Sequence, residues 1–200
     1  MAIQINGNGT ITGISAGGLP AGTVTSATLA SGVGGKVLQV INNVATEVIS
    51  LTNQQSWTVV PGTDQNGTGS AFALTVTPAS ATSKFLITFQ LKYAGTNNDV
   101  SGFRWQRGST ALTKATNTGN RVAVGATGNY EGNNSNNISP TIVYQILLDS
   151  PNTTSQIIYA PYYYKYHSDT AYLNRSVRDT EGGTYDQRCT SELTLMEIAA

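Results

Sequence analysis

From residue 36 onward, apolar and polar side chains alternate along the chain with a period of two. The clearest run spans residues 85–93, where Phe, Ile, Phe, Leu and Tyr occupy every second position. Shorter runs of the same kind cover residues 72–76, 103–105, 142–148 and 193–195. Successive side chains of a strand point to opposite faces of a sheet, so this period is typical of β-strands with one buried face. Clusters of Gly, Pro, Asn or Ser bound each run, as expected for strands separated by turns.

No segment shows convincing helical periodicity. The sequence therefore predicts an all-β chain of about eight to ten strands, folded as a sandwich or a barrel. Trp57 and Trp105 lie in strand-like runs, and we expect both to be buried in the core. The polar stretch 125–139 has the composition of an exposed loop at one end of a sandwich.

The first 35 residues follow a different pattern. Two short β-type runs, residues 2–5 and 10–14, stand between Asn-Gly turns, and the remainder is rich in Gly, Ala, Ser and Thr. Large apolar side chains are too few to offset the roughly 1–2 kcal/mol per residue that ordering the backbone costs. We therefore expect residues 1–35 to form a stem that gains its order from other chains, and residues 36–200 to form a head domain. The isoleucines predicted to build the stem are Ile3, Ile5, Ile11 and Ile14.

Composition narrows the possible partners. Charged residues make up only 11% of the chain, against about 25% in typical domains, and the formal net charge is zero. Nucleic-acid binding depends on basic clusters, and no run of Lys or Arg occurs, so nucleic acid is not an expected partner. The single cysteine excludes an intramolecular disulfide. The N-terminus lacks a secretory signal, and no apolar run reaches the ~20 residues that span a bilayer, so we expect no membrane insertion.

Candidate catalytic residues are sparse. His167 is the only histidine, so His-based metal clusters are excluded, and its neighbours Ser168 and Asp169 would point to different faces of a strand. No G-x-S-x-G nucleophile elbow occurs. Paired carboxylates could hydrolyse a glycosidic bond, but almost any fold brings some loop carboxylates together. We therefore predict a protein that is not an enzyme, with no catalytic residues, no metal site and no cofactor.

Six tyrosines crowd residues 159–172. We predict that Tyr162, Tyr164 and Tyr166 lie in a subunit interface or in the core, because tyrosine combines apolar area with a polar tip. The alternative is a surface on which their rings stack against sugars. Polar loop residues are candidates for receptor contact, with an ordinary solvated loop as the alternative: Tyr130, Asn133, Asn134, Asn136, Asn137 and Tyr185.

Several stretches carry a resemblance to a known family, of which ITGISAGGLP and the MEI ending are the most distinctive: INGNGTITGISAGGLP, GTVTSATLASG and GKVLQV near the N-terminus, then SKFLITFQLKY, FRWQRGSTAL, LLDSPNTTS, YLNR and the terminal SELTLMEIAA. Together they resemble fibre proteins of tailed bacteriophages, particularly those of marine and cyanobacterial hosts. The heads of such fibres look like compact jelly rolls similar to the tumour-necrosis-factor and complement-type trimeric domains. The resemblance therefore implies an all-β chain with an N-terminal β-stem and a jelly-roll head.

The resemblance also implies a function. We expect a short homotrimeric fibre of the virion, made in the host cytoplasm and released on lysis. Its N-terminus would attach to other virion proteins, of the tail or the capsid, and its head loops would recognise a host-surface glycan or protein. Two alternatives stay open: a capsid-attached head fibre or decoration protein with a purely structural role, and a small glycan hydrolase on the same scaffold.

Overall fold

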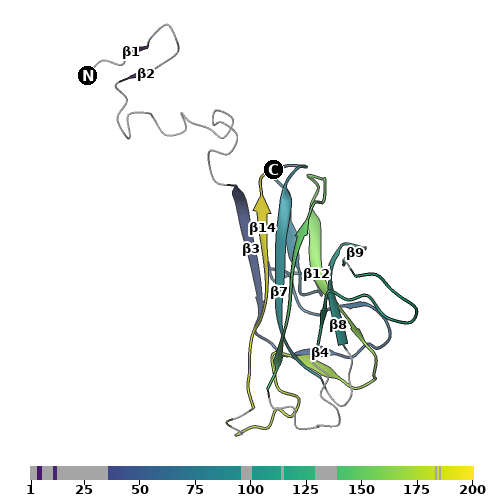
Figure 1. Cartoon of the computed structure of the whole chain (residues 1–200). Helices are drawn as coiled ribbons and strands as arrows, with labels where there is room; N and C mark the ends of the chain where they lie inside the picture. The colour runs from purple at the N-terminus through teal and green to yellow at the C-terminus, as the bar shows by residue number, and fades with distance from the viewer. Residues whose placement is uncertain are drawn as a thin grey trace. The chain divides into compact units, whose positions relative to one another are not determined.

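The computed structural model describes residues 36–95, 101–113, 115–128, 139–182, 184 and 186–200, together with the backbone of residues 4–5 and 11–12. These residues form strands, bridges, turns and bends, with no helix among them. The prediction of an all-β chain is confirmed. The chain divides into two units, Met1–Lys36 and Val37–Ala200, and the second contains both large sheets (Figure 1).

In the first unit, β1 (Gln4–Ile5) pairs antiparallel with β2 (Ile11–Thr12). The β-type runs predicted at residues 2–5 and 10–14 are described only in part, and their four described residues pair with each other within one chain. Ile5 is the register partner of Ile11. Ile3 and Ile14 lie outside the described residues. A stem built from several chains stays a prediction.

The first large sheet is built around β7 (Lys84–Ala94). Strands β11 (Thr141–Asp149) and β14 (Ser191–Ile198) both pair with its residues 85–90, so they lie on opposite sides of it. Beyond β14 comes β3 (Val37–Ala45), while the short β13 (Ala171–Leu173) continues from the far end of β7 to β4 (Ile49–Leu51). All these pairings are antiparallel.

The second sheet is built around β12 (Ile157–Lys165) and β8 (Ser101–Arg107), which pair along the whole of β8. β12 also pairs with β5 (Thr58–Val59) and β6 (Leu74–Val76), and β8 with β9 (Thr110–Leu112) and β10 (Ala126–Thr127). These pairings are antiparallel as well.

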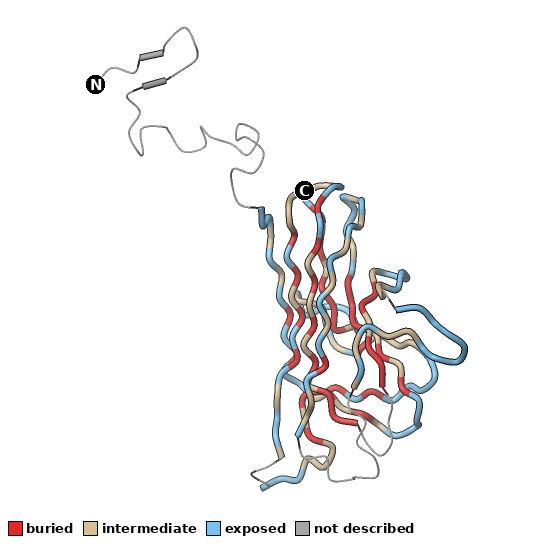
Figure 2. Tube along the Cα trace, in the orientation of Figure 1, coloured by how far each residue is buried: buried red, intermediate tan, exposed pale blue. Residues whose placement is uncertain are grey.

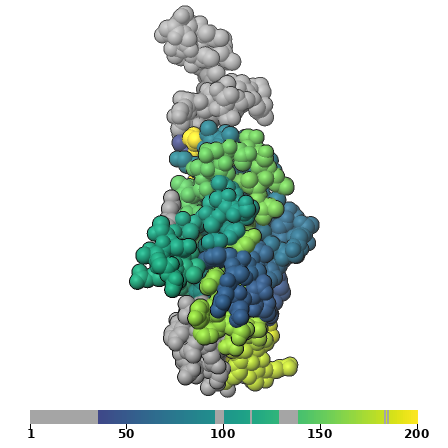
Figure 3. All heavy atoms as spheres, turned by 90° about the vertical axis from the view of Figure 1, so that its right-hand side faces the viewer, coloured from purple at the N-terminus to yellow at the C-terminus, as the bar shows by residue number. Residues whose placement is uncertain are grey.

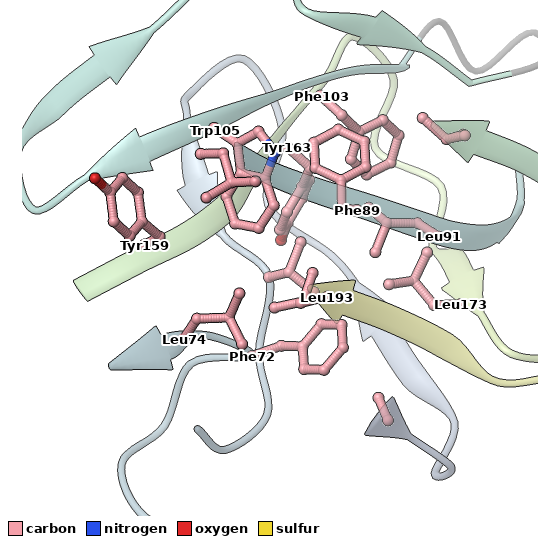
Figure 4. Packing of buried hydrophobic residues seen from close by; sticks show 14 of the residues in the cluster. Phe72, Leu74, Phe89, Leu91, Phe103, Trp105, Tyr159, Tyr163, Leu173 and Leu193 are labelled. Atoms are coloured by element: carbon pink, nitrogen blue, oxygen red, sulfur yellow. The ribbon is translucent and has the colours of Figure 1, made fainter. Parts of the chain in front are cut away.

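Aromatic side chains join the two sheets across the core (Figure 4). Phe89 of β7 lies 5.4 Å from Trp105 of β8, measured between ring centroids. The same strands contribute an edge-on contact, also at 5.4 Å, between Tyr93 and Phe103. Buried and exposed positions alternate along the long strands, as Figure 2 shows. The predicted burial of Trp105 is confirmed, whereas Trp57 is only half-buried and lies on the other face of the second sheet.

Asn174 links the ends of three strands of the first sheet through hydrogen bonds. Its backbone φ of 69° is in the left-handed region, which asparagine tolerates better than most residues. Its buried amide donates to the carbonyl oxygens of Ala45 (2.9 Å) and Glu47 (2.8 Å), and its oxygen accepts from the Ser191 hydroxyl (2.6 Å). This residue of the YLNR stretch therefore fixes the ends of β3, β13 and β14 relative to one another.

Glu197, in the last strand, is fully buried. Its carboxylate accepts hydrogen bonds from the Gln39 amide and from the backbone N–H of Ala79 (2.7 Å). Burial alone would raise the pKa of Glu197, but these donors outweigh burial and lower that pKa below its ordinary value of 4.5. The ionised carboxylate therefore stabilises the fold above pH 4.5, and this stabilisation is lost as the pH falls through the depressed folded-state pKa.

The Glu197→Gln variant tests this contribution. At neutral pH we expect it to lower the free energy of unfolding by about 1–3 kcal/mol, because hydrogen bonds to a buried charge are lost. At about pH 3, well below the ordinary carboxyl pKa of 4.5, the gap should narrow, because the unfolded wild-type chain then binds a proton at Glu197 that the folded state takes up less readily. Glu192→Gln, on the exposed side of the same strand, is the control. Denaturant unfolding at both pH values measures the gap, and an equal gap at both would contradict this role.

The contact between the sheets is tested by Phe89→Ala. Removal of a fully buried ring leaves a cavity, and we expect a loss of about 3–5 kcal/mol in the free energy of unfolding. Thr88→Ala, one position away and facing outward, should change it by less than about 0.5 kcal/mol. Urea unfolding at one fixed protein concentration makes the comparison. Similar losses in both variants would mean that residue 89 is not the one that faces the core.

Candidate functional site

The most unusual surface of the second unit is the outer side of β11. Four of its side chains are between 52% and 58% exposed: Ile142, Tyr144, Ile146 and Leu148. The residues between them include Val143, which is buried, and Leu147, which packs against the core. Antiparallel strands commonly show polar residues on the side that faces water. β11 instead has its large apolar side chains mainly on the exposed face, while the opposite face carries Gln145 and Asp149 beside Val143 and Leu147.

Register extends this surface across the sheet. Leu148 pairs with Leu86 of β7, Leu86 with Met196 of β14, and Met196 with Val40 of β3. The next row joins Ile146 to uncharged polar residues of the three other strands. The outer apolar face is defined here as Leu38, Val40, Val44, Leu86, Ile142, Tyr144, Ile146, Leu148 and Met196. Contiguous exposed apolar patches on soluble proteins mark interaction surfaces.

The free edge of β11 adds to this surface. Among the described residues, β11 pairs with β7 alone, so its other edge presents unpaired N–H and C=O groups along nine residues. A long apolar edge strand readily pairs with other chains, and natural proteins usually cover or interrupt such edges. β11 therefore has two features that favour contact with another chain.

The second sheet has a different outer face, on the side of the molecule that Figure 3 presents. Tyr162 and Tyr164 are half-buried there, and Tyr166 is exposed. The tyrosines that fill the core are Tyr159 and Tyr163. Tyr162, Tyr164 and Tyr166 are therefore not core residues of this chain. Their role in a subunit interface stays a prediction.

Trp57 supports this tyrosine face. Its ring lies 5.7 Å from that of Tyr164, and the guanidinium carbon of Arg104 lies 3.9 Å above it. Burial lowers the pKa of Arg104, but the group keeps its charge, which the indole face stabilises. Arg104, Trp57 and Tyr164 thus form one stacked series on the surface. The sequence missed it because strand alternation alone predicted Trp57 in the core.

A hollow of about 440 Å³ lies beside this series. Gly102 of β8 is at its centre, because its register partners are Tyr164 on one side and Thr127 on the other. Val122 and Val124, from the segment that precedes β10, also line the hollow. A Cβ atom at residue 102 would lie only 2.2 Å from Cγ1 of Val124, so the glycine is what lets this segment approach the sheet.

Three carboxylates, Asp149, Asp179 and Asp186, form structural contacts. Asp149 accepts from Arg107 (2.6 Å) and from the hydroxyl of Tyr159 (2.7 Å). Burial first, and then the hydrogen bond to Asp149, raise the pKa of Tyr159, so it remains a neutral donor. Asp179 and Asp186 form ion pairs with arginines of their own loop. Within the described residues no group of three or more His, Cys, Asp or Glu is arranged to hold a metal ion.

The remaining predicted residues are placed as follows. His167 is exposed and its ring contacts that of Tyr166 edge-on, with centroids 5.0 Å apart. The loop residues predicted for receptor contact all lie outside the described residues: Tyr130, Asn133, Asn134, Asn136, Asn137 and Tyr185.

No protein-family model and no curated protein matches the sequence. In the part of the chain that the structure describes, no helix is long and apolar enough to cross a membrane.

The role of Gly102 is tested by Gly102→Ala. The added methyl group displaces Val124, and we expect a loss of about 1–3 kcal/mol in the free energy of unfolding. Val124→Ala removes the obstructing atom, so the double variant should be more stable than the two single losses predict by addition. Denaturant unfolding of all four proteins measures the coupling. Strictly additive losses would show that the two side chains do not compete for the same space.

Proposed function

We propose that this chain is a short homotrimeric fibre of a tailed-phage particle, attached through its N-terminal unit and recognising the host surface with its head. The sequence resemblance supplies the class of protein. The observation that carries the proposal is the outer apolar face, because a lone head would leave it in water. In a trimer on the particle, a neighbouring copy of the chain would cover this face.

Strand pairing supports a jelly-roll head. Taken in chain order, the eight main strands are β3, β6, β7, β8, β9, β11, β12 and β14. The first pairs with the eighth, the second with the seventh, the third with the sixth and the fourth with the fifth. Such nested pairing is what results when one long antiparallel hairpin is rolled into two sheets, as in jelly rolls.

The distribution of apolar residues supports a closed ring of copies. In the sheet order β3-β14-β7-β11, apolar side chains are concentrated on the two outermost strands, as in Val40 of β3 and Ile146 of β11. On the two middle strands Leu86 and Met196 join these regions in one row, and the next row holds the polar residues Thr88 and Thr194. A head-to-tail contact between the β11 edge of one copy and the β3 side of the next uses both apolar regions. Such contacts form a ring when the rotation closes.

A trimer also suits weak recognition of a repetitive surface. Three heads on one fibre, and many fibres on one particle, raise the overall avidity without strengthening any single contact. The nearly uncharged, hydroxyl- and amide-rich composition is suited to a glycan or protein receptor. In the capsid-attached alternative the same trimer decorates the particle and binds no receptor.

The trimer is tested by Ile146→Lys in the full chain. Wild type should have a mass in solution three times that of the 21.0 kDa chain, and the variant should dissociate, because the charge would be buried against a neighbour. Ile158→Lys is the matched control, since Ile158 is similarly exposed (49% against 53%) but lies on β12. Light scattering coupled to gel filtration measures both. A monomeric wild type, or dissociation in both variants, would contradict the assignment of the interface.

Receptor recognition is tested with the labelled full chain and bacteria on which particles carrying this chain multiply. We expect the wild-type trimer to bind the cells and Ile146→Lys to bind them weakly, because avidity is lost. Antibodies against the chain should label the particle. If the antibodies label the particle but the chain does not bind the cells, the structural alternative is favoured and a receptor role is excluded.

A further inference from the structure

The hollow on the second sheet has the size and the walls of a ligand site. Its volume of about 440 Å³ lies within the roughly 300–1,000 Å³ of typical small-molecule pockets. Gly102 lacks a side chain, which lets Val124 approach the sheet, and the hollow is lined by both residues together with Tyr164, Tyr166 and Thr127. The segment that carries Val122 raises one wall above it.

Each of the two aromatic rings of the hollow contacts another ring, and Tyr164 is also half-buried. Tyr164 contacts Trp57, which Arg104 covers on its face. The ring of Tyr166 rests edge-on against that of His167. Rings that are already oriented lose little conformational freedom on binding, which favours affinity. Tyr166 is also 56% exposed, so much of its surface is free to contact a ligand.

The lining indicates an uncharged ligand. None of the residues that line the hollow carries a charge. The charge of nearby Arg104 lies against the Trp57 ring, and its buried Nε atom has no hydrogen-bond partner among the described residues. A carboxylate or phosphate would therefore lose hydration without meeting a cationic side chain among the residues that line the hollow. The exposed side chains of Asn120 and Thr127 offer neutral donors and acceptors at the rim.

We propose that this hollow binds one unit of an uncharged pyranose sugar. The apolar C–H face of the sugar would lie against Tyr166 and Tyr164, and its hydroxyl groups would exchange hydrogen bonds with Asn120 and Thr127. This inference rests on the proposed function, for which it names the receptor as a neutral glycan. It places recognition on the second sheet, away from the face assigned to contacts between copies.

Saturation-transfer difference NMR on the purified full chain tests the proposal. The probes are the methyl pyranosides of glucose, galactose, mannose and N-acetylglucosamine, with methyl glucuronide as the charged comparison. We expect transfer to the C–H protons of at least one neutral probe and none to the glucuronide. Tyr166→Ala should weaken binding of the active probe roughly three- to tenfold, as expected for loss of one aromatic contact. Val122→Arg should abolish it by placing a charge in the hollow.

Two controls separate the possible outcomes. Ile158→Ala lies on the same strand and face outside the hollow, and it should bind as wild type. The proposal would be overturned if no neutral probe bound, or if neither test variant changed the binding. It would also be overturned if the chain preferred the glucuronide. A change of solution mass in Tyr166→Ala would overturn it too, by making this face an interface between copies. Because the assay uses neither cells nor particles, its failure leaves the trimer and adhesion experiments standing.

Discussion

The aromatic packing between β7 and β8 decides which side of every long strand faces outward. Once Phe89 and Tyr93 pack against Trp105 and Phe103, the intervening residues of β7 must face away from the core. Antiparallel register then transfers the same choice to β11 and β14, because directly opposite residues share a face. A shift of one residue would exchange the two faces completely.

This constraint gives the second unit two outer faces with different chemistry. On the first sheet it directs Ile142, Ile146 and Leu148 into solvent, where they are best covered by another chain. On the second sheet it directs Tyr164 outward beside a glycine, and a neutral hollow results. Assembly and recognition, as proposed, therefore use opposite sides of the same sandwich. Neither use requires the ion pairs of Asp149, Asp179 and Asp186, which hold strand ends and a loop together.

Alternation in the sequence was sufficient to predict the strands whose two faces differ. Residues 85–93 and 193–195 have one clearly apolar set, and the core contains that set. Residues 157–166 carry apolar or aromatic side chains at both odd and even positions. Alternation therefore could not distinguish the core residue Tyr163 from the outward-facing Tyr164. Only the register with β8 does so, by placing Tyr163 opposite Phe103.

The candidate sites were harder to predict from the sequence. The exposed set of β11 has the same apolar pattern as a core strand, so only its position at a sheet edge identifies it as a surface. Trp57 was expected inside because it lies in a strand-like run, yet it is only partly buried and contacts Arg104 and Tyr164 on the outer face. The hollow depends on Gly102 and on a segment some twenty residues later along the chain, and no local pattern joins them.

The central claim is that copies of this chain cover the outer apolar face and leave the tyrosine face open. Tyr144 and Tyr166 represent the two faces, and in a single chain they are 52% and 56% exposed. Hydroxyl-radical footprinting of the purified full chain, read by mass spectrometry, compares their oxidation rates directly. We predict that Tyr144 is strongly protected while Tyr166 reacts freely. Equal oxidation of the two tyrosines would contradict it.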